Sequence, residues 1–219
     1  FTAMVKQGII FGATEKIGSY LASQISSRGG EIILQDNSRS RLEILRKKLD
    51  RIKNNQTFLY CDHSNIQNFS NIDLVIARKF DKLDFVISCL GTIDTLRPIS
   101  HLDLDDWNKT IMENLTINWY IIKKTDKLLG KSKNPYFVFF SSKEISQGKT
   151  YFHAYSTAHG AIKTLLNIYE KEKKKFGYNI KFFEINKNDL SYLSHVIKNK
   201  KNSYFKSKIN RIVKEIFGS

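Results

Sequence analysis

Short runs of apolar residues alternate along the chain with longer segments in which apolar residues recur every three or four positions. The short runs predict strands buried on both faces, and the longer segments predict helices that cover them. The expected strands lie at residues 8–11, 31–36, 57–62, 84–91, 136–142 and 180–185. The expected helices lie at about residues 17–28, 42–49, 72–80, 105–129, 155–176 and 209–217. This alternation predicts an α/β fold: a doubly wound, Rossmann-like parallel sheet of about six strands with helices on both faces.

The chain is expected to form a single domain, residues 4–219, because no Pro- or Ser-rich linker divides it. Phe1, Thr2 and Ala3 precede the first methionine, Met4, and are interpreted as a remnant of expression. No apolar run reaches the roughly 20 residues of a membrane-spanning helix. No signal sequence is recognised either, so a soluble, cytoplasmic protein without membrane attachment is expected.

The charge is positive and unevenly distributed. The formal net charge is +15, and residues 110–219 hold 21 basic and 8 acidic side chains. Frequent lysine is also produced by AT-rich coding DNA, and no aromatic-basic stacking pattern accompanies it. Nucleic-acid binding is therefore not expected, although an anion-binding surface on the basic half stays an alternative. Cys61 and Cys89 lie in apolar runs and predict no disulfide, which is typical of a reducing compartment.

The turn after the first strand has small residues where a phosphate needs close approach to the backbone. Gly12 and Gly18 flank this strand-to-helix turn, and a helix N-terminus binds phosphate. Asp36 ends the second strand, where a carboxylate can bind an adenosine ribose and repel a 2'-phosphate. The combination predicts NAD rather than NADP. Alternatively, the glycines serve only helix packing and Asp36 is a surface turn residue.

The segment FGATEKIG, residues 11–18, together with the spacing of Asn114, Ser142 and Tyr155, resembles the short-chain dehydrogenase/reductase family over about residues 5–190. Two of the three glycines of the family's T-G-x-x-x-G-x-G segment are present. Lys16 stands at the middle one, where its side chain would either crowd a pyrophosphate or turn outward. The cofactor-binding residues that the resemblance implies are Gly12, Thr14, Lys16, Ile17, Gly18, Asp36, Asp62 at the adenine, and Gly91, the last residue of the S-C-L-G that replaces N-N-A-G.

The resemblance also implies a catalytic set of Asn114, Ser142, Tyr155 and His159. In the family the tyrosine phenol is the general acid/base, the serine holds the substrate oxygen, and the asparagine backbone helps to order a water relay. Ser142 is favoured over Ser141 because it lies 13 residues before the tyrosine. The family has a lysine four residues after the tyrosine, on the same helix face, and this chain has His159 there.

His159 changes the expected chemistry. A phenol with a pKa near 10 needs a neighbouring cation to act as a base near pH 7. Lysine is charged at that pH, whereas imidazole, with a reference pKa of about 6.5, is mostly neutral. A two-unit loss of pKa tuning slows proton transfer by up to about a hundredfold, so weakened catalysis is expected. We interpret His159 as a tolerated residue rather than a new proton donor, and we expect no zinc site with His153, six residues away.

Two functions therefore stay open for the sequence. The first is an NAD-linked oxidoreductase acting on a carbonyl or alcohol of a small-molecule substrate. The second is a catalytically silent binding or scaffold protein, because Lys16, Cys89, His159 and Lys187 depart from the family's pattern. Lys187 and Asn188 replace the family's Pro-Gly, and the polar residues 189–208 indicate a shortened or absent lid. The resemblance also implies a homo-oligomer, a dimer or tetramer, formed through the two helices that carry Asn114 and Tyr155.

Overall fold

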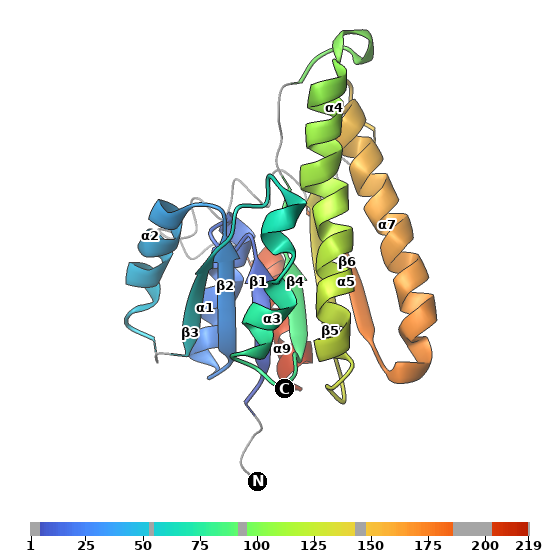
Figure 1. Ribbon diagram of the computed structural model, residues 1–219. Helices are drawn as coiled ribbons and strands as arrows, with labels where there is room; N and C mark the ends of the chain where they lie inside the picture. The colour runs from blue at the N-terminus through green and yellow to red at the C-terminus, as the bar shows by residue number, and fades with distance from the viewer. Residues whose placement is uncertain (1–4, 53–54, 92–95, 143–147, 186–202, 219) are drawn as a thin grey trace.

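The strands of the computed structural model form one parallel sheet (Figure 1). The structure describes residues 5–52, 55–91, 96–142, 148–185 and 203–218. Within them the sheet has six strands in the order β3-β2-β1-β4-β5-β6. The strand order reverses at β1: β2 and β3 lie on one side of it, and β4, β5 and β6 lie on the other. The predicted α/β class and parallel sheet are confirmed. The strands are β1 (Gln7–Phe11), β2 (Glu31–Asp36), β3 (Gln56–Tyr60), β4 (Phe85–Ser88), β5 (Tyr136–Ser142) and β6 (Asn179–Ile185).

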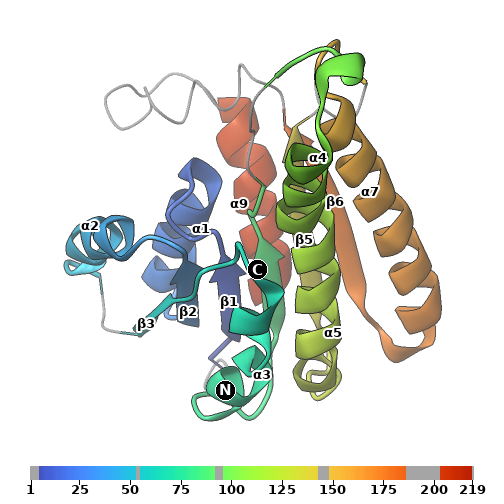
Figure 2. The ribbon, with the colours of Figure 1, turned by 45° about the horizontal axis from the view of Figure 1, so that its top comes forward.

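Helices cover both faces of this sheet (Figures 1 and 2). One face is covered by α3, α5 and α7, and the other by α1, α2 and α9. The described helices are α1 (Lys16–Ser27), α2 (Arg39–Leu49), α3 (Ile72–Ala77), α4 (Leu104–Ile111), α5 (Ile117–Leu129), α7 (His153–Lys173) and α9 (Ser203–Phe217). In Figure 1, α4 and the start of α7 rise beyond the carboxyl ends of the strands.

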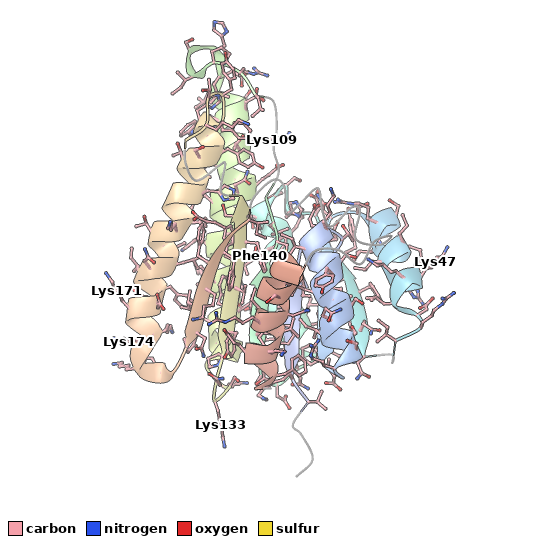
Figure 3. All side chains as sticks on the ribbon, turned by 180° about the vertical axis from the view of Figure 1, so that it is seen from behind. Lys47, Lys109, Lys133, Phe140, Lys171 and Lys174 are labelled. Atoms are coloured by element: carbon pink, nitrogen blue, oxygen red, sulfur yellow. The ribbon has the colours of Figure 1, made fainter. Side chains whose placement is uncertain are left out.

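The core consists of two apolar layers, one on each side of the sheet. Strand β5 shows why its sequence is apolar throughout: Phe137 and Phe139 enter one layer, and Val138 and Phe140 enter the other. Phe140 lies on the side of the sheet that α9 covers (Figure 3). Both strand faces are therefore buried by helices.

The last helix forms as the pattern of residues 209–217 predicts. Ile209, Ile212, Val213 and Ile216 recur at helical spacing and are each at most 2% exposed. They join the layer that contains α1, and α9 packs against that helix. The C-terminal segment thus completes the cover of the sheet.

Several predicted boundaries differ from the structure, and two of the differences lie close to the candidate site. The expected helix over residues 105–129 is interrupted by a π-helical turn, Met112–Thr116, which separates α4 from α5. The expected strand over residues 57–62 ends at Tyr60, because the chain turns after its last pairing with Asp36 of β2. Both changes lie at the edge of the sheet where the strands end.

Lysine side chains project into solvent from separate elements of the fold. Lys47 on α2, Lys109 on α4, and Lys171 at the end of α7 are exposed, as is Lys133 before β5 (Figure 3). The positive charge is therefore not confined to one helix. No helix among the described residues has the length and apolar character needed to cross a membrane.

Candidate functional site

Two glycines shape the turn between β1 and α1. Gly12 has φ +69°, and a Cβ on it would lie 3.0 Å from the carbonyl carbon and oxygen of Cys89. A Cβ on Gly18 would lie 2.4 Å from the carbonyl oxygen of Gly12, so only glycine lets α1 approach β1 this closely. The N-cap residue Glu15 makes no side-chain hydrogen bond to the helix. The positive end of α1 therefore faces the turn, and a phosphate fits this cradle.

Lys16 occupies the place of the middle glycine. It is the first residue of α1, and its side chain is exposed. Ile17 beside it is 8% exposed and belongs to the apolar layer on the α1 side of the sheet. The Lys16 stem therefore does not pack into the core of the turn, and its ammonium stands in solvent beside the helix N-terminus.

Asp36 ends β2 and is only 1% exposed. Its Oδ2 accepts hydrogen bonds from Thr14 Oγ1 at 2.6 Å and Thr14 N at 3.3 Å. Its Oδ1 accepts from Ser38 N at 3.1 Å and from Arg41 Nη2 at 3.0 Å. The alternative that Asp36 is a surface turn residue is therefore wrong. Because a carboxylate has about four acceptor positions, a ribose hydroxyl at Asp36 would compete with these protein donors.

Arg41 joins the turns that follow the first two strands. Its Nη1 lies 2.9 Å from Glu15 Oε1, and its Nη2 lies 3.0 Å from Asn37 Oδ1 as well as from Asp36. The amide of Asn37 donates in turn to His63 Nε2 at 3.2 Å. Burial lowers the pKa of His63, so it accepts this bond as a neutral imidazole. Two carboxylates and one guanidinium meet here, so the local balance is negative.

Asp62 follows β3 at the same edge of the sheet. Its Oδ1 accepts from Ser64 N at 2.9 Å and its Oδ2 from Ser64 Oγ at 3.0 Å. The bond from the Ser64 backbone N–H holds the pKa of this carboxyl below its usual value. Asp62 is therefore a partly exposed, ionised group at the edge where the resemblance places the adenine.

The π-helical turn around Asn114 is held by side-chain amides. Asn114 Nδ2 donates to Thr110 O at 2.8 Å, and Asn118 Nδ2 donates to Asn114 O at 2.8 Å. Ser88, at the end of β4, donates to Asn118 Oδ1 at 2.6 Å. π-Helical turns occur frequently at functional sites. The Asn114 carbonyl, which the resemblance assigns to a water relay, thus accepts a hydrogen bond from the Asn118 side chain.

Tyr155 and His159 lie one turn apart on the buried face of α7. They are 5% and 4% exposed, and their rings stack with centroids 5.6 Å apart and an interplanar angle of 14°. The ring of Phe139 also contacts His159, with centroids 5.9 Å apart. Burial lowers the pKa of His159 to about 4, so its imidazole is neutral at pH 7. The position four residues after the tyrosine therefore carries no cation.

Among the described side chains, Ser141 is the serine that contacts His159. Ser141 Oγ lies 2.6 Å from His159 Nδ1 in a buried contact. The backbone of Ser142 ends β5 opposite Ile185, and its side chain lies outside the described atoms. Spacing to the tyrosine favoured Ser142. Alternation along the strand would have indicated Ser141, because it shares a strand face with Phe139, which contacts α7.

Gly91 lies where the side chains of Asn114 and His159 converge. A Cβ on Gly91 would lie 3.2 Å from Asn114 Oδ1 and 3.9 Å from His159 Nε2. Nε2 is buried and has no hydrogen-bond partner among the described residues. Because buried polar atoms nearly always have a hydrogen-bond partner, Nε2 is placed to bond an ordered water or a group of a bound molecule.

A small cleft adjoins Tyr155 between α4 and the start of α7. Its lining combines apolar rings and chains with a carboxylate and hydroxyls, but its volume of about 10 Å³ has room for only about one water molecule. The lining residues are Leu96, Leu102, Asp106, Thr110, Tyr151, Phe152, His153, Ala154 and Tyr155.

Some predicted features lie elsewhere. Lys187, Asn188 and residues 189–202 fall outside the described residues, so the expected lid is not described. His153 lies at the start of α7, where its Nε2 donates to Arg97 O at 2.9 Å. The described part of the chain contains no cluster of three or more His, Cys, Asp or Glu side chains able to hold a metal. Cys61 and Cys89 are both free thiols.

Comparison with known proteins gives a family match over most of the chain. Residues 6–187 match the family described as short chain dehydrogenase. The 3beta-hydroxysteroid dehydrogenase of Mediterraneibacter gnavus is 23% identical over 124 residues, which cover 57% of this chain and 45% of that protein. The D-threitol dehydrogenase of Mycolicibacterium smegmatis is 25% identical over 111 residues, covering 51% and 42%. These matches span less than half the length of either curated relative.

Solved structures share the fold. A protein from Escherichia coli CFT073, described as a short chain dehydrogenase complexed with NADPH, superposes with a TM-score of 0.83 at 17% identity, covering 98% of this chain and 92% of that one. A short-chain type dehydrogenase/reductase from Mycobacterium ulcerans superposes with a TM-score of 0.77 at 18% identity, covering 83% and 67%. The fold extends over nearly the whole chain.

Proposed function

The chain belongs to the short chain dehydrogenase family of oxidoreductases, and on this premise we propose that it transfers a hydride between NAD(H) and a carbonyl or alcohol carbon of a small molecule. The observation that carries the proposal is the convergence of Asn114 and His159 on Gly91, with Tyr155 stacked against the histidine. We also propose that catalysis is weak, because the group beside Tyr155 is a neutral imidazole.

The residues at this edge of the sheet fit a nicotinamide dinucleotide. Gly12 and Gly18 leave a cradle at the N-terminus of α1 that a Cβ would fill, which suits the pyrophosphate. Asp36 and Asp62 lie at the ends of β2 and β3, on the adenosine side. The buried Nε2 of His159 supplies the polar atom on the nicotinamide side. When bound, the cofactor supplies the hydride donor or acceptor that the side chains of this chain do not provide.

The preference for NAD over NADP rests on charge. Glu15 and Asp36 flank the place of the adenosine ribose, and Arg41 is already paired with both. A 2'-phosphate would meet two carboxylates, and recruiting Arg41 would break both ion pairs. Like charges placed together oppose binding. The E. coli neighbour is complexed with NADPH, but at 17% identity it supports only the shared fold. The coenzyme preference is therefore inferred from Glu15 and Asp36 of this chain.

Tyr155 is the proton-transfer group in this proposal. In reduction, its phenol O–H gives a proton to the substrate oxygen as the carbonyl carbon accepts hydride. In oxidation, the phenolate takes the hydroxyl proton as hydride leaves that carbon. An ordinary phenol ionises near pH 10, and the neutral His159 does not stabilise the phenolate. The oxidation direction, in which the phenolate is the base, is therefore slowed near neutral pH.

The proposal is tested by the turnover of a panel of carbonyl compounds with NADH, using the wild type, His159→Lys and Tyr155→Phe. We expect slow wild-type turnover, an increase of up to about a hundredfold in His159→Lys, and none in Tyr155→Phe. Because a buried lysine can unfold the protein, the melting temperature of each variant is measured first. Turnover that survives Tyr155→Phe would contradict the role of the tyrosine.

A catalytically silent binding protein is the second candidate. The observation that favours it is the burial of Tyr155, which is 5% exposed beneath the His159 ring. This candidate predicts NADH binding without turnover, even in His159→Lys. Turnover by the wild type on any compound of the panel would exclude it.

We also propose that two copies of the chain pair through a groove between α5 and α7. Small and apolar residues line it, and two large ones, Trp119 and Ile168, are 42% and 49% exposed. Ala161→Arg places a charge in this groove and should shift the protein from dimer to monomer in sedimentation velocity. A wild type that sediments as a monomer would contradict the pairing. The groove is lined by Leu115, Thr116, Trp119, Gly160, Ala161, Thr164, Leu165 and Ile168.

A further inference from the structure

Ser141 contacts His159 although neither the family resemblance nor the proposed reaction assigns it a role. We propose that Ser141 is a positioning residue, which donates its hydroxyl hydrogen to His159 Nδ1 and so fixes the imidazole as the Nε2–H tautomer aimed at a hydroxyl of the bound cofactor. This inference rests on the proposed function. It names the atom through which the histidine acts in the lysine's place.

The surroundings of His159 leave its ring one orientation. Tyr155 stacks on the ring at 14°, and Phe139 contacts it from β5. Within the plane set by the stacked Tyr155 ring, the 2.6 Å contact from Ser141 Oγ fixes Nδ1. The other nitrogen, Nε2, then faces the glycine that follows β4, because a Cβ on Gly91 would lie 3.9 Å from it. The contact with Ser141 of β5 thus orients Nε2 by fixing Nδ1 on the opposite side of the ring.

The tautomer follows from the atom on the other side of Gly91. Asn114 Nδ2 donates to Thr110 O at 2.8 Å, which turns the Asn114 amide oxygen toward Gly91. A hydroxyl group between the two side chains can accept from Nε2–H and donate to this oxygen, which has two lone pairs. With the hydrogen on Nδ1 instead, Nε2 and the amide oxygen would both be acceptors, and a hydroxyl has one hydrogen to give.

The contact does more than stabilise the fold. A pair kept only for packing would satisfy both ring nitrogens or expose one, whereas here Nε2 is buried without a partner among the described residues. The His159 imidazole is also neutral at pH 7, because burial lowers its pKa to about 4. A neutral imidazole offers a single N–H, so the choice of tautomer decides whether the site presents a donor or an acceptor.

The tautomer is measured by 15N NMR of the five histidines in the protein without cofactor, with the His159 signals identified by their loss in His159→Gln. We expect the Nε2–H form in the wild type and a shift toward Nδ1–H or a mixture in Ser141→Ala. A calorimetric titration with NADH then should show binding on the order of tenfold weaker in Ser141→Ala.

The matched control is Ser132→Ala. Ser132 is also buried and donates at 2.6 Å, to Asp84, at the opposite edge of the sheet. The Ser132→Ala substitution should lower the melting temperature without changing the His159 tautomer or the affinity for NADH. Ser141→Cys, with a weak donor of similar shape, serves if Ser141→Ala does not fold, and should fall between wild type and alanine.

Two results would overturn the inference: an Nδ1–H tautomer in the wild type, or an unchanged tautomer and NADH affinity in the Ser141 variants. Failure of the proposed function is separate from these. If the wild type binds no NADH, the proposed function fails. The NMR measurement would still show whether Ser141 determines the tautomer of His159.

Discussion

Acidification should destabilise this protein through His159 in particular. Burial lowers the pKa of His159 from 6.5 to about 4, while in the unfolded chain it returns to its ordinary value near 6.5. Between these values the unfolded state binds the proton and the folded state does not, so the free energy of unfolding falls as the pH falls from about 6.5 to 4. The full difference corresponds to ~3 kcal/mol, of which ~2 kcal/mol is lost between pH 7 and pH 5.

The assay is urea unfolding at pH 7 and pH 5, followed by the fluorescence of the two tryptophans. His63 also has a pKa lowered by burial, so the comparison is between the wild type and His159→Gln, which keeps His63 and removes the titration at 159. The wild type should lose ~2 kcal/mol more than the variant over this range. An equal loss in both would refute the reasoning, because it would show that His159 takes up its proton equally well in the folded state.

Three further substitutions test the packing of the site and its supports. Gly18→Ala should cost about 1–3 kcal/mol in urea unfolding and weaken NADH binding, because its Cβ would lie 2.4 Å from a backbone oxygen; an unchanged midpoint would contradict the close approach of α1. Thr14→Val removes a 2.6 Å hydrogen bond to the buried Asp36 and should cost about 1.5–3 kcal/mol. By contrast, Ser27→Ala removes an exposed hydrogen bond to Gln24 O and should change unfolding by less than about 0.5 kcal/mol; equal effects would refute the role of Asp36. Tyr169→Phe removes one of several bonds to Asp126 and should lower the unfolding free energy by only about 1 kcal/mol, and a loss above about 3 kcal/mol would contradict that sharing.

The fold could be predicted from the sequence because its signal is repeated along the chain. Each buried strand is apolar at nearly every position, as in residues 136–140, and each helix has a single apolar stripe, as in α9. These patterns depend on burial alone. Hydrophobic periodicity therefore locates the strands and helices without knowledge of their partners.

The π-helical turn could not be predicted in this way. Met112–Thr116 continues the helical pattern of apolar residues, so its sequence predicts one uninterrupted helix. The interruption depends on where the amides of Asn114 and Asn118 find carbonyl partners and on Ser88 from another strand. Such contacts join residues far apart in the sequence, and periodicity contains no information about them.

The candidate site was predicted in part for a similar reason. Residue types and spacing indicate the glycine turn and bring Tyr155 and His159 to one face of a helix. They do not show that Arg41 pairs with Asp36, which depends on the rotamer of the arginine. Spacing favours Ser142, whose side chain lies outside the described atoms, and it gives no sign that Ser141 contacts the histidine. Side-chain partners across the sheet edge decide these points.

The proposed function requires that this edge of the sheet binds a dinucleotide and prefers NAD(H). Calorimetric titration of the wild-type protein with NADH and, separately, with NADPH measures both properties. We expect saturable, one-site binding of NADH and binding of NADPH weaker by at least about tenfold, a difference of about 1.4 kcal/mol. No detectable heat with NADH at millimolar concentration, or tighter binding of NADPH, would contradict it.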